Sequence, residues 1–205
     1  MIVFENFFDN PDEVRQYALS LKYNKHPGGV PGKRTDNIRD LNSNIFETFQ
    51  MKLLNILYGS GQFEVNINAF FQLTPAHYEE GWVHTDNVGL PNEPTVAGVI
   101  YLTPNAPLSA GTSIYSGNPY SSAVPINHNI KIDFYQDKEV DMSEYRLERD
   151  RNNALYTKTV DVANIYNRLL VYNTTQLHRE NMFFGTTNED SRMTLVFFAL
   201  IERIQ

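Results

Sequence analysis

The segment His84-Thr85-Asp86 has the residue types and the spacing of a metal-binding pair. On a strand, positions i and i+2 project to the same face, so His84 and Asp86 could bind one cation while Thr85 points away. In a chain of this composition, a histidine and an aspartate at this spacing also arise by chance with a probability of roughly one in four. Taken alone, the pair is therefore better explained as a solvated strand end.

His178 is the residue that could complete a metal site with this pair. It follows the apolar segment 169–172, which fits a strand lying beside the first two residues. Two imidazoles and one carboxylate on one face of a metal leave positions open for a co-substrate and dioxygen, an arrangement suited to Fe(II) oxygenases. The alternative is a histidine in a surface loop beside Arg179 and Glu180, because a single histidine is often not a ligand.

Arg192 and Thr194 open the last apolar segment of the chain and would share one face of a strand. A buried guanidinium keeps its charge and therefore needs an acidic partner. A dicarboxylate co-substrate would supply that partner as a bidentate pair, and the Thr194 hydroxyl would add one hydrogen bond. The alternative is an ion pair with Asp190 or Glu189 at the entry to the strand.

The segments that must position these residues are mainly short strands. Alternating or apolar runs predict strands over 63–68, 70–73, 82–86, 95–102, 112–115, 169–172 and 192–201. The last of them is apolar on both faces, which places it inside a sandwich or barrel. Two helices precede the strands: one opens at Asn10-Pro11 with Glu13 completing a capping box, and another runs from about Asn44 to Tyr58. This order predicts a mainly β fold, an antiparallel sandwich or jelly roll with N-terminal helices.

Composition and charge restrict the class of protein. The 205 residues are 41% hydrophobic and 13% aromatic, which is enough for one domain with a substantial core. The net charge of −7 disfavours a nucleic-acid partner, because phosphate binding needs clustered Lys and Arg. There is no cysteine, so a metal site must use His, Asp and Glu. Neither a signal peptide nor a membrane-spanning run is found, and we expect a cytoplasmic protein.

The order of the candidate residues resembles the 2-oxoglutarate and Fe(II)-dependent dioxygenase superfamily. The residues that carry the resemblance are His84 and Asp86, then His178, then Arg192 and Thr194. Similar segments also lie at 7–11, 98–103, 111–115 and 167–172. More specifically, the chain is similar to the prolyl-hydroxylase-like branch, including small phage and bacterial oxygenases. The resemblance covers most of residues 1–115 and 165–202.

The resemblance implies a double-stranded β-helix core of the jelly-roll or cupin-like kind, in which His84, Asp86 and His178 hold Fe(II). The implied activity is that of an oxidoreductase, a dioxygenase of the hydroxylase type. It would consume dioxygen and 2-oxoglutarate, hydroxylate a small molecule or a peptide, and release succinate and carbon dioxide. The wide separation of the two histidines would follow from an insert between them.

The resemblance also implies a co-substrate site. Arg192, helped by Thr194, would bind the distal carboxylate of 2-oxoglutarate. Tyr101 matches a tyrosine of the family whose hydroxyl assists that carboxylate.

We expect a single oxygenase domain over 1–205. Residues 1–60 would give helical support, 61–115 and 165–202 the β core, and 116–164 a polar insert. We expect the insert and the loop at 24–37 to shape the choice of substrate.

Two other functions stay open at this point. One is a cupin-like metal enzyme that uses no 2-oxoglutarate, in which Arg192 would point away from the metal. The other is a non-catalytic jelly-roll module with a structural or binding role and no metal. Lys33-Arg34 could reach an anionic substrate but is interpreted as a surface pair, and no pattern indicates an oligomeric state.

Overall fold

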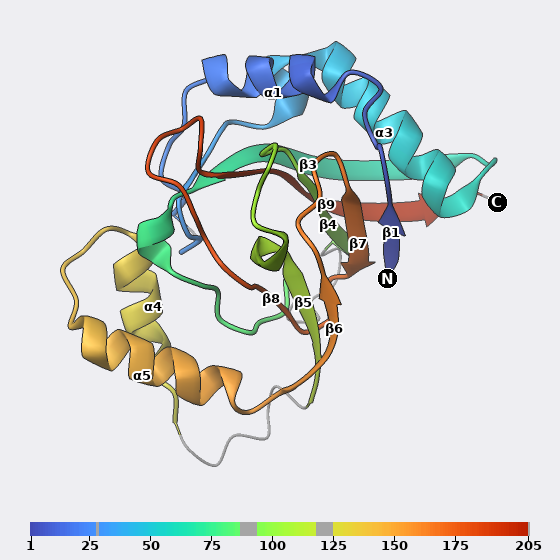
Figure 1. Cartoon of the computed structure of the whole chain (residues 1–205). Helices are drawn as coiled ribbons and strands as arrows, with labels where there is room; N and C mark the ends of the chain where they lie inside the picture. Colours follow the sequence, from blue (N-terminus) through green and yellow to red (C-terminus); the bar gives the residue numbers. More distant parts are fainter. Residues whose placement is uncertain (28, 87–93, 118–124, 205) are drawn as a thin grey trace.

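The computed structural model describes residues 1–27, 29–86, 94–117 and 125–204 as two antiparallel sheets with helices on the outside (Figure 1). In the described residues, the larger sheet has the strand order β1-β7-β4-β9-β3-β2 and the smaller has the order β6-β5-β8. The strands are β1 (Ile2–Phe4), β2 (Lys33–Arg34), β3 (Phe63–Thr74), β4 (Val96–Tyr101), β5 (Thr112–Ser116), β6 (Thr157–Val162), β7 (Leu169–Asn173), β8 (His178–Glu180) and β9 (Arg192–Arg203). The helices are α1 (Pro11–Ser20), α2 (Ile38–Leu41), α3 (Ser43–Tyr58), α4 (His128–Tyr135) and α5 (Met142–Asn153), with 3-10 turns η1 (Ala76–Tyr78) and η2 (Leu108–Ala110). The predicted mainly β class with N-terminal helices is confirmed.

The two predicted N-terminal helices form, but their ends differ in how they are capped. Asn10 is the N-cap of α1, yet its side chain makes no capping hydrogen bond, so the predicted capping box is wrong. The side chain of Asn42 does cap α3, accepting a hydrogen bond from the Ile45 amide at 3.1 Å. Gly59 ends α3 with a φ of 69°, a conformation that costs a glycine little because it has no Cβ.

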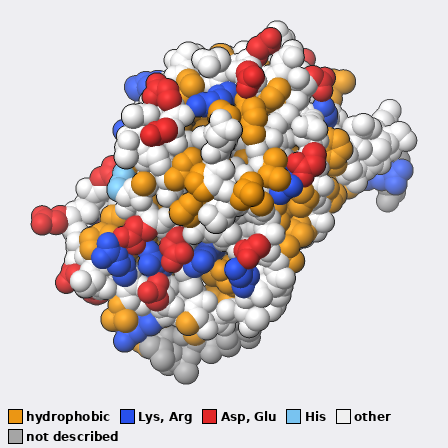
Figure 2. Space-filling model, viewed as in Figure 1, with side chains coloured by type: hydrophobic (Ala, Val, Ile, Leu, Met, Phe, Trp, Pro, Cys, Tyr) orange, Lys and Arg blue, Asp and Glu red, His pale blue; other side chains and the backbone are white. Residues whose placement is uncertain are grey.

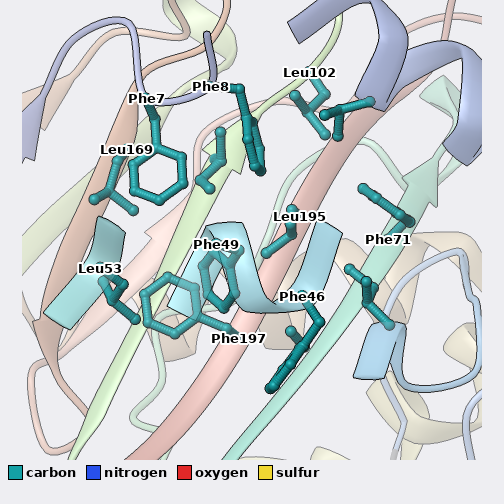
Figure 3. Packing of buried hydrophobic residues seen from close by; sticks show 14 of the residues in the cluster. Phe7, Phe8, Phe46, Phe49, Leu53, Phe71, Leu102, Leu169, Leu195 and Phe197 are labelled. Atoms are coloured by element: carbon teal, nitrogen blue, oxygen red, sulfur yellow. The ribbon is translucent and has the colours of Figure 1, made fainter. Parts of the chain in front are cut away.

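Helices α1 and α3 cover one face of the six-stranded sheet (Figure 1). Phe46, Phe49 and Leu53 of α3 pack against Phe71 of β3 and Phe197 of β9, and all five side chains are at most 5% exposed. Figure 3 shows these rings and leucines interlocked over the strands. The hydrophobic layer holds β3 and β9 from outside, so their other face is free to line a site between the sheets.

Strand β9 lies inside the larger sheet, as its sequence predicts. It pairs with β3 on one side and with β4 on the other. Leu195 and Phe197 belong to the cluster under the helices, whereas Val196 belongs to the cluster between the sheets. Arg192 and Thr194 therefore share the face that looks toward the smaller sheet.

In its described residues, the expected insert contains two helices and a strand. Helices α4 and α5 lie beside the smaller sheet, away from α1 and α3 (Figure 1). Strand β6 pairs with β5, with Thr112 opposite Val162, so this part of the insert completes the smaller sheet. No helix of the described residues is both long and apolar enough to cross a membrane.

Candidate metal centre and co-substrate cavity

His84, Asp86 and His178, which we call the metal group, come together between the two sheets. One ligand atom from each residue lies within 4.8 Å of the others, the one such group of histidine, cysteine and acidic residues in the described part of the chain. His84 Nε2 lies 3.6 Å from Asp86 Oδ1, and His178 Nε2 lies 3.5 Å from Asp86 Oδ2. Both distances are long for a hydrogen bond and leave room for an ion between the three groups.

The backbones of the two histidines are joined directly. The His84 amide donates to the His178 carbonyl at 3.0 Å, and the His178 amide donates to the His84 carbonyl at 2.9 Å. These bonds form an isolated bridge, and no ladder continues from it, so the predicted regular strand over 82–86 is wrong. The Asp86 amide instead donates to the Thr174 carbonyl at 2.9 Å, which brings its carboxylate back toward the histidines.

Side chains of α5 bind the outer edge of this irregular segment. The Val83 amide donates to Asn153 Oδ1 at 2.7 Å, and Asn152 Nδ2 donates to the Val83 carbonyl at 3.0 Å. Asn153 Nδ2 also donates to the Gly81 carbonyl at 3.3 Å. The asparagine side chains thus replace a neighbouring strand, and they hold the backbone on both sides of Val83 in place beside the metal group. This contact is a property of the fold that the sequence pattern does not indicate.

Ion pairs fasten α5 to the turn that precedes the segment. Glu79 Oε2 lies 2.7 Å from Arg149 Nη1, and Glu79 Oε1 lies 2.9 Å from Arg146 Nε. Figure 2 shows acidic and basic side chains intermixed in the lower half of this face, around α5. The hydrogen bond from Arg146 lowers the pKa of Glu79, so the carboxylate keeps its charge to a lower pH than a free glutamate does.

Hydrogen bonds fix which ring nitrogen of each histidine can bind a metal. His84 Nδ1 lies 2.8 Å from the Trp82 carbonyl oxygen, and His178 Nδ1 lies 2.9 Å from the Gln176 carbonyl oxygen. A carbonyl oxygen only accepts, so Nδ1 carries the hydrogen in both rings. The lone pair of each Nε2 then faces the Asp86 carboxylate. Metal-binding histidines are held in this way, with the second ring nitrogen bonded to a carbonyl or carboxylate.

Charge and burial at Asp86 favour a bound cation. Burial acts to raise the pKa of Asp86, but the facing His178 and His84 outweigh it, and the pKa is lowered. Burial lowers the pKa of His178. The same effect acts on His84, but there its interaction with Asp86 prevails and the pKa is raised. Asp86 Oδ2 is buried without a hydrogen-bond partner, which is costly for a charged carboxylate unless an ion compensates it.

Arg192 lies in the same cavity, which has a volume of about 270 Å³. Its side chain is fully buried, and its Nε donates to the Ala110 carbonyl at 3.3 Å. Its Nη2 has no hydrogen-bond partner in the described structure. The predicted alternative, an ion pair with Asp190 or Glu189, is absent from the described ion pairs, and the Asp190 carboxylate binds amides of its own loop. The guanidinium thus keeps a donor available for a ligand.

The other two expected co-substrate residues differ in position. Thr194 lines the cavity with Arg192. Tyr101 is fully buried beside the arginine, whose guanidinium carbon lies 5.5 Å from the tyrosine ring. The Tyr101 hydroxyl donates to Thr112 Oγ1 at 2.8 Å, and Tyr101 is not among the described residues that line the cavity.

Three further charged residues of the described part of the chain line the cavity. Glu180 stands two positions after His178 on β8, a spacing from which its place could have been predicted. Arg34 was expected on the surface, but it packs between the rings of Phe70 and Phe198 and faces the cavity, so that interpretation is wrong. Lys131 comes from α4, and no spacing in the sequence connects it with the metal group.

The fold is a double-stranded β-helix, and the solved structures that share it include prolyl hydroxylases. A prolyl hydroxylase from Trichoplax adhaerens, solved with a hypoxia inducible factor peptide, superposes with a TM-score of 0.60 at 12% identity over 97% of this chain and 82% of that one. EvdO2 from Micromonospora carbonacea var. aurantiaca gives 0.59 at 11% identity over 98% and 87%. HygX from Streptomyces hygroscopicus, with nickel and 2-oxoglutarate bound, gives 0.57 at 12% identity over 97% and 81%.

These likenesses concern the fold, and at that level the resemblance indicated by the sequence is confirmed. The chain itself belongs to a family of unknown function, DUF6445, whose model matches residues 1–198. A comparison with curated protein sequences finds no match.

Proposed function

We propose that the protein is an Fe(II)- and 2-oxoglutarate-dependent dioxygenase of the hydroxylase type. His84, Asp86 and His178 would hold the iron, and Arg192 with Thr194 would bind the distal carboxylate of 2-oxoglutarate. The observation that carries the proposal is that two unsatisfied groups of opposite kind share one cavity. Asp86 has a buried carboxylate oxygen without a partner, and Arg192 has a buried donor without a partner.

The chain's own residues would do the positioning. The carbonyls of Trp82 and Gln176 hold both imidazoles with Nε2 toward the metal position. Arg192 orients the co-substrate as a fixed cation, and Tyr101 packs against its guanidinium from outside the cavity. Val99, which also lines the cavity, adds an apolar wall that keeps water from the reacting groups.

The iron, when bound, would supply the oxidising chemistry. In the overall reaction, 2-oxoglutarate loses carbon dioxide and becomes succinate, which retains one atom of dioxygen. The second oxygen atom enters a C–H bond of the substrate to give a hydroxyl group. Protein residues donate no electrons in this balance, so their contribution is binding and orientation.

An anaerobic titration with Fe(II) and 2-oxoglutarate tests the proposal. A weak visible charge-transfer band should appear in the wild type, because the co-substrate would chelate the iron. His84→Ala should lose the band, whereas His77→Ala, which changes an exposed histidine of η1, should keep it. Release of succinate in air, without added substrate, gives a second measurement.

The same titration separates the competing functions. Metal binding without the band, and without succinate, would favour a cupin-like metal enzyme that uses no 2-oxoglutarate. No metal binding in the wild type would favour a module without catalysis. The position of Arg192 in the metal cavity supports the 2-oxoglutarate assignment, because a cupin-like enzyme of the other kind would not need it there.

A further inference from the structure

Lys131 directs an ammonium group into the cavity that contains the metal group. It shares one face of α4 with Tyr135, four positions further on, which also lines the cavity. Its Nζ lies 5.9 Å from the centre of the Trp82 ring and 5.8 Å from that of Tyr135. Among the described residues, no acidic group lies within ion-pair distance of this ammonium. Burial lowers the pKa of Lys131, as expected for a cation withdrawn from water.

Arg34 brings a second cation to the cavity from a different element, β2. Its Nε donates to Gln72 Oε1 at 2.7 Å, which orients the guanidinium from the neighbouring strand β3. Its central carbon lies 5.6 Å from the Phe198 ring. The ion pairs of the described residues do not include Arg34 either. Both cations therefore face the cavity with donors available.

Helix α4 and the loop before β2 are fastened to each other. Gln136 Nε2 donates to the His26 carbonyl at 2.8 Å, and Lys25 Nζ donates to the Tyr135 carbonyl at 3.0 Å. Lys25 also lies 2.7 Å from Asp137 Oδ1. These bonds hold together the two elements that carry Lys131 and Arg34, so both cations belong to one built wall.

The charges that line the cavity do not balance once the proposed ligands are bound. Among the described residues of the lining, three cations, Arg34, Lys131 and Arg192, stand against two carboxylates, Asp86 and Glu180. A divalent iron would add two positive charges and 2-oxoglutarate would remove two. One positive charge then remains in excess, and Lys131 and Arg34 line the same cavity as the three proposed metal ligands. A substrate with a negative group would compensate it.

We propose that the substrate carries an anionic group, a carboxylate or a phosphate, which binds Lys131 with Arg34 as the second cation. The remainder of the substrate would then extend toward the metal position. The inference rests on the proposed function for the reaction that follows, but the anion site does not depend on it. It assigns to α4 of the expected insert a direct role in choosing the substrate.

Trp82 allows a direct test, because it is the single tryptophan of the chain and lies beside Lys131. Protein loaded with Ni(II) and 2-oxoglutarate, so that those sites are filled, is titrated at constant ionic strength with inorganic phosphate or with acetate. Acetamide serves as the uncharged control. We expect a saturable change in Trp82 fluorescence with at least one anion and none with acetamide. The anion that binds with the higher affinity indicates which group the substrate carries.

Variants assign the response to Lys131. Lys131→Met keeps the aliphatic stem against the rings and should weaken anion binding roughly tenfold or more, because it removes a charged donor. Lys131→Arg should restore most of the affinity. Lys138→Met alters an exposed lysine just beyond α4 and should behave like the wild type. Glu180→Gln should tighten anion binding, because it removes a repelling carboxylate from the cavity.

Two results would overturn the inference: no saturable response to either anion, or equal half-saturation in wild type and Lys131→Met. A Lys131 that serves only as a counter-ion for Glu180 would give the first result in both wild type and Glu180→Gln. Failure of the proposed function has a different outcome. The charge-transfer band with Fe(II) and 2-oxoglutarate would be missing, while the anion titration, repeated without metal, would still respond.

Discussion

At the scale of single residues, the site depends on polar atoms whose partners are missing. A buried arginine whose Nη2 has no acceptor is unfavourable in a folded protein unless a ligand supplies the acceptor. The Arg192 side chain is fully buried and its Nε donates to the Ala110 carbonyl, so the guanidinium has little freedom to turn away. The fold thus holds a donor in readiness for a carboxylate.

Replacing Arg192 should therefore affect the co-substrate more than the metal. We expect Arg192→Ala to weaken binding of 2-oxoglutarate to the Ni(II)-loaded protein by roughly 30-fold or more, in line with a loss of about 2–5 kcal/mol for a truncated buried charge pair. Isothermal titration calorimetry measures the affinity for Ni(II) and the affinity for 2-oxoglutarate. Arg203→Ala, at the exposed end of the same strand, is the matched control. Equal affinities in the two variants would contradict the assignment.

At the scale of elements, helix α5 supports the metal group through its asparagines. Asn153→Ala leaves the Val83 amide without its acceptor, a loss of about 1–3 kcal/mol for a buried donor. Because the neighbouring residue is a proposed ligand, Ni(II) affinity should fall roughly tenfold. Asn153→Asp keeps an acceptor oxygen and should retain most of the affinity. If both variants bind nickel like the wild type, the helix does not position the site.

We expect acidic pH to destabilise the packing of α5. The hydrogen bond from Arg146 lowers the pKa of Glu79 below its ordinary 4.5, so the ion pairs stabilise the folded state above that value. Their contribution is lost as the pH falls through the lowered pKa. Hydrogen exchange of the α5 amides, corrected for the intrinsic effect of pH, should therefore accelerate below about pH 4.5 relative to pH 6. Glu79→Gln should show fast exchange at both values, whereas an unchanged wild-type profile would contradict the role of Glu79.

At the scale of the whole molecule, stability and chemistry occupy opposite faces of the large sheet. Leu53→Ala empties part of the layer under α3 and should lower the free energy of unfolding by about 2–5 kcal/mol, measured in urea. Met51→Ala changes a residue of the same helix that is 71% exposed and should stay within about 0.5 kcal/mol of the wild type. While folded, both variants should bind Ni(II) normally. Loss of nickel binding by folded Leu53→Ala would show that the two faces are coupled.

The parts of the molecule that the sequence predicts are those with a simple period. Strand β9 is recognisable because apolar residues occupy both of its faces, and α3 because its apolar residues recur at helical spacing. Helix α5 lacks such a stripe, because the residues that it buries include Glu148, Arg149 and Asn152. Polar residues buried through specific partners leave no hydrophobic pattern, so neither α5 nor its contact with Val83 could be predicted.

The residues of the candidate site also fall into those that a simple spacing predicts and those that it does not. Glu180 follows His178 by two positions on β8, so strand geometry relates this pair. His84 and Asp86 have the same spacing, which indicates the pair in the sequence, although the segment that carries them forms no regular strand. The wall formed by Lys131 and Arg34 arises from elements far apart in the chain. It depends on how α4 packs against the loop before β2, which only the folded structure shows.

The asparagine side chains on Val83 also have a consequence for solubility. The segment of His84 extends the smaller sheet beyond β8, and its outward backbone groups would form an open sheet edge. Such edges recruit strands from other molecules and start aggregation. Asn153 accepts from the Val83 amide and Asn152 donates to the Val83 carbonyl, and neither side chain can continue a sheet. The helix that supports the metal group therefore also blocks intermolecular strand pairing, and a double alanine variant should scatter light at concentrations where the wild type stays clear.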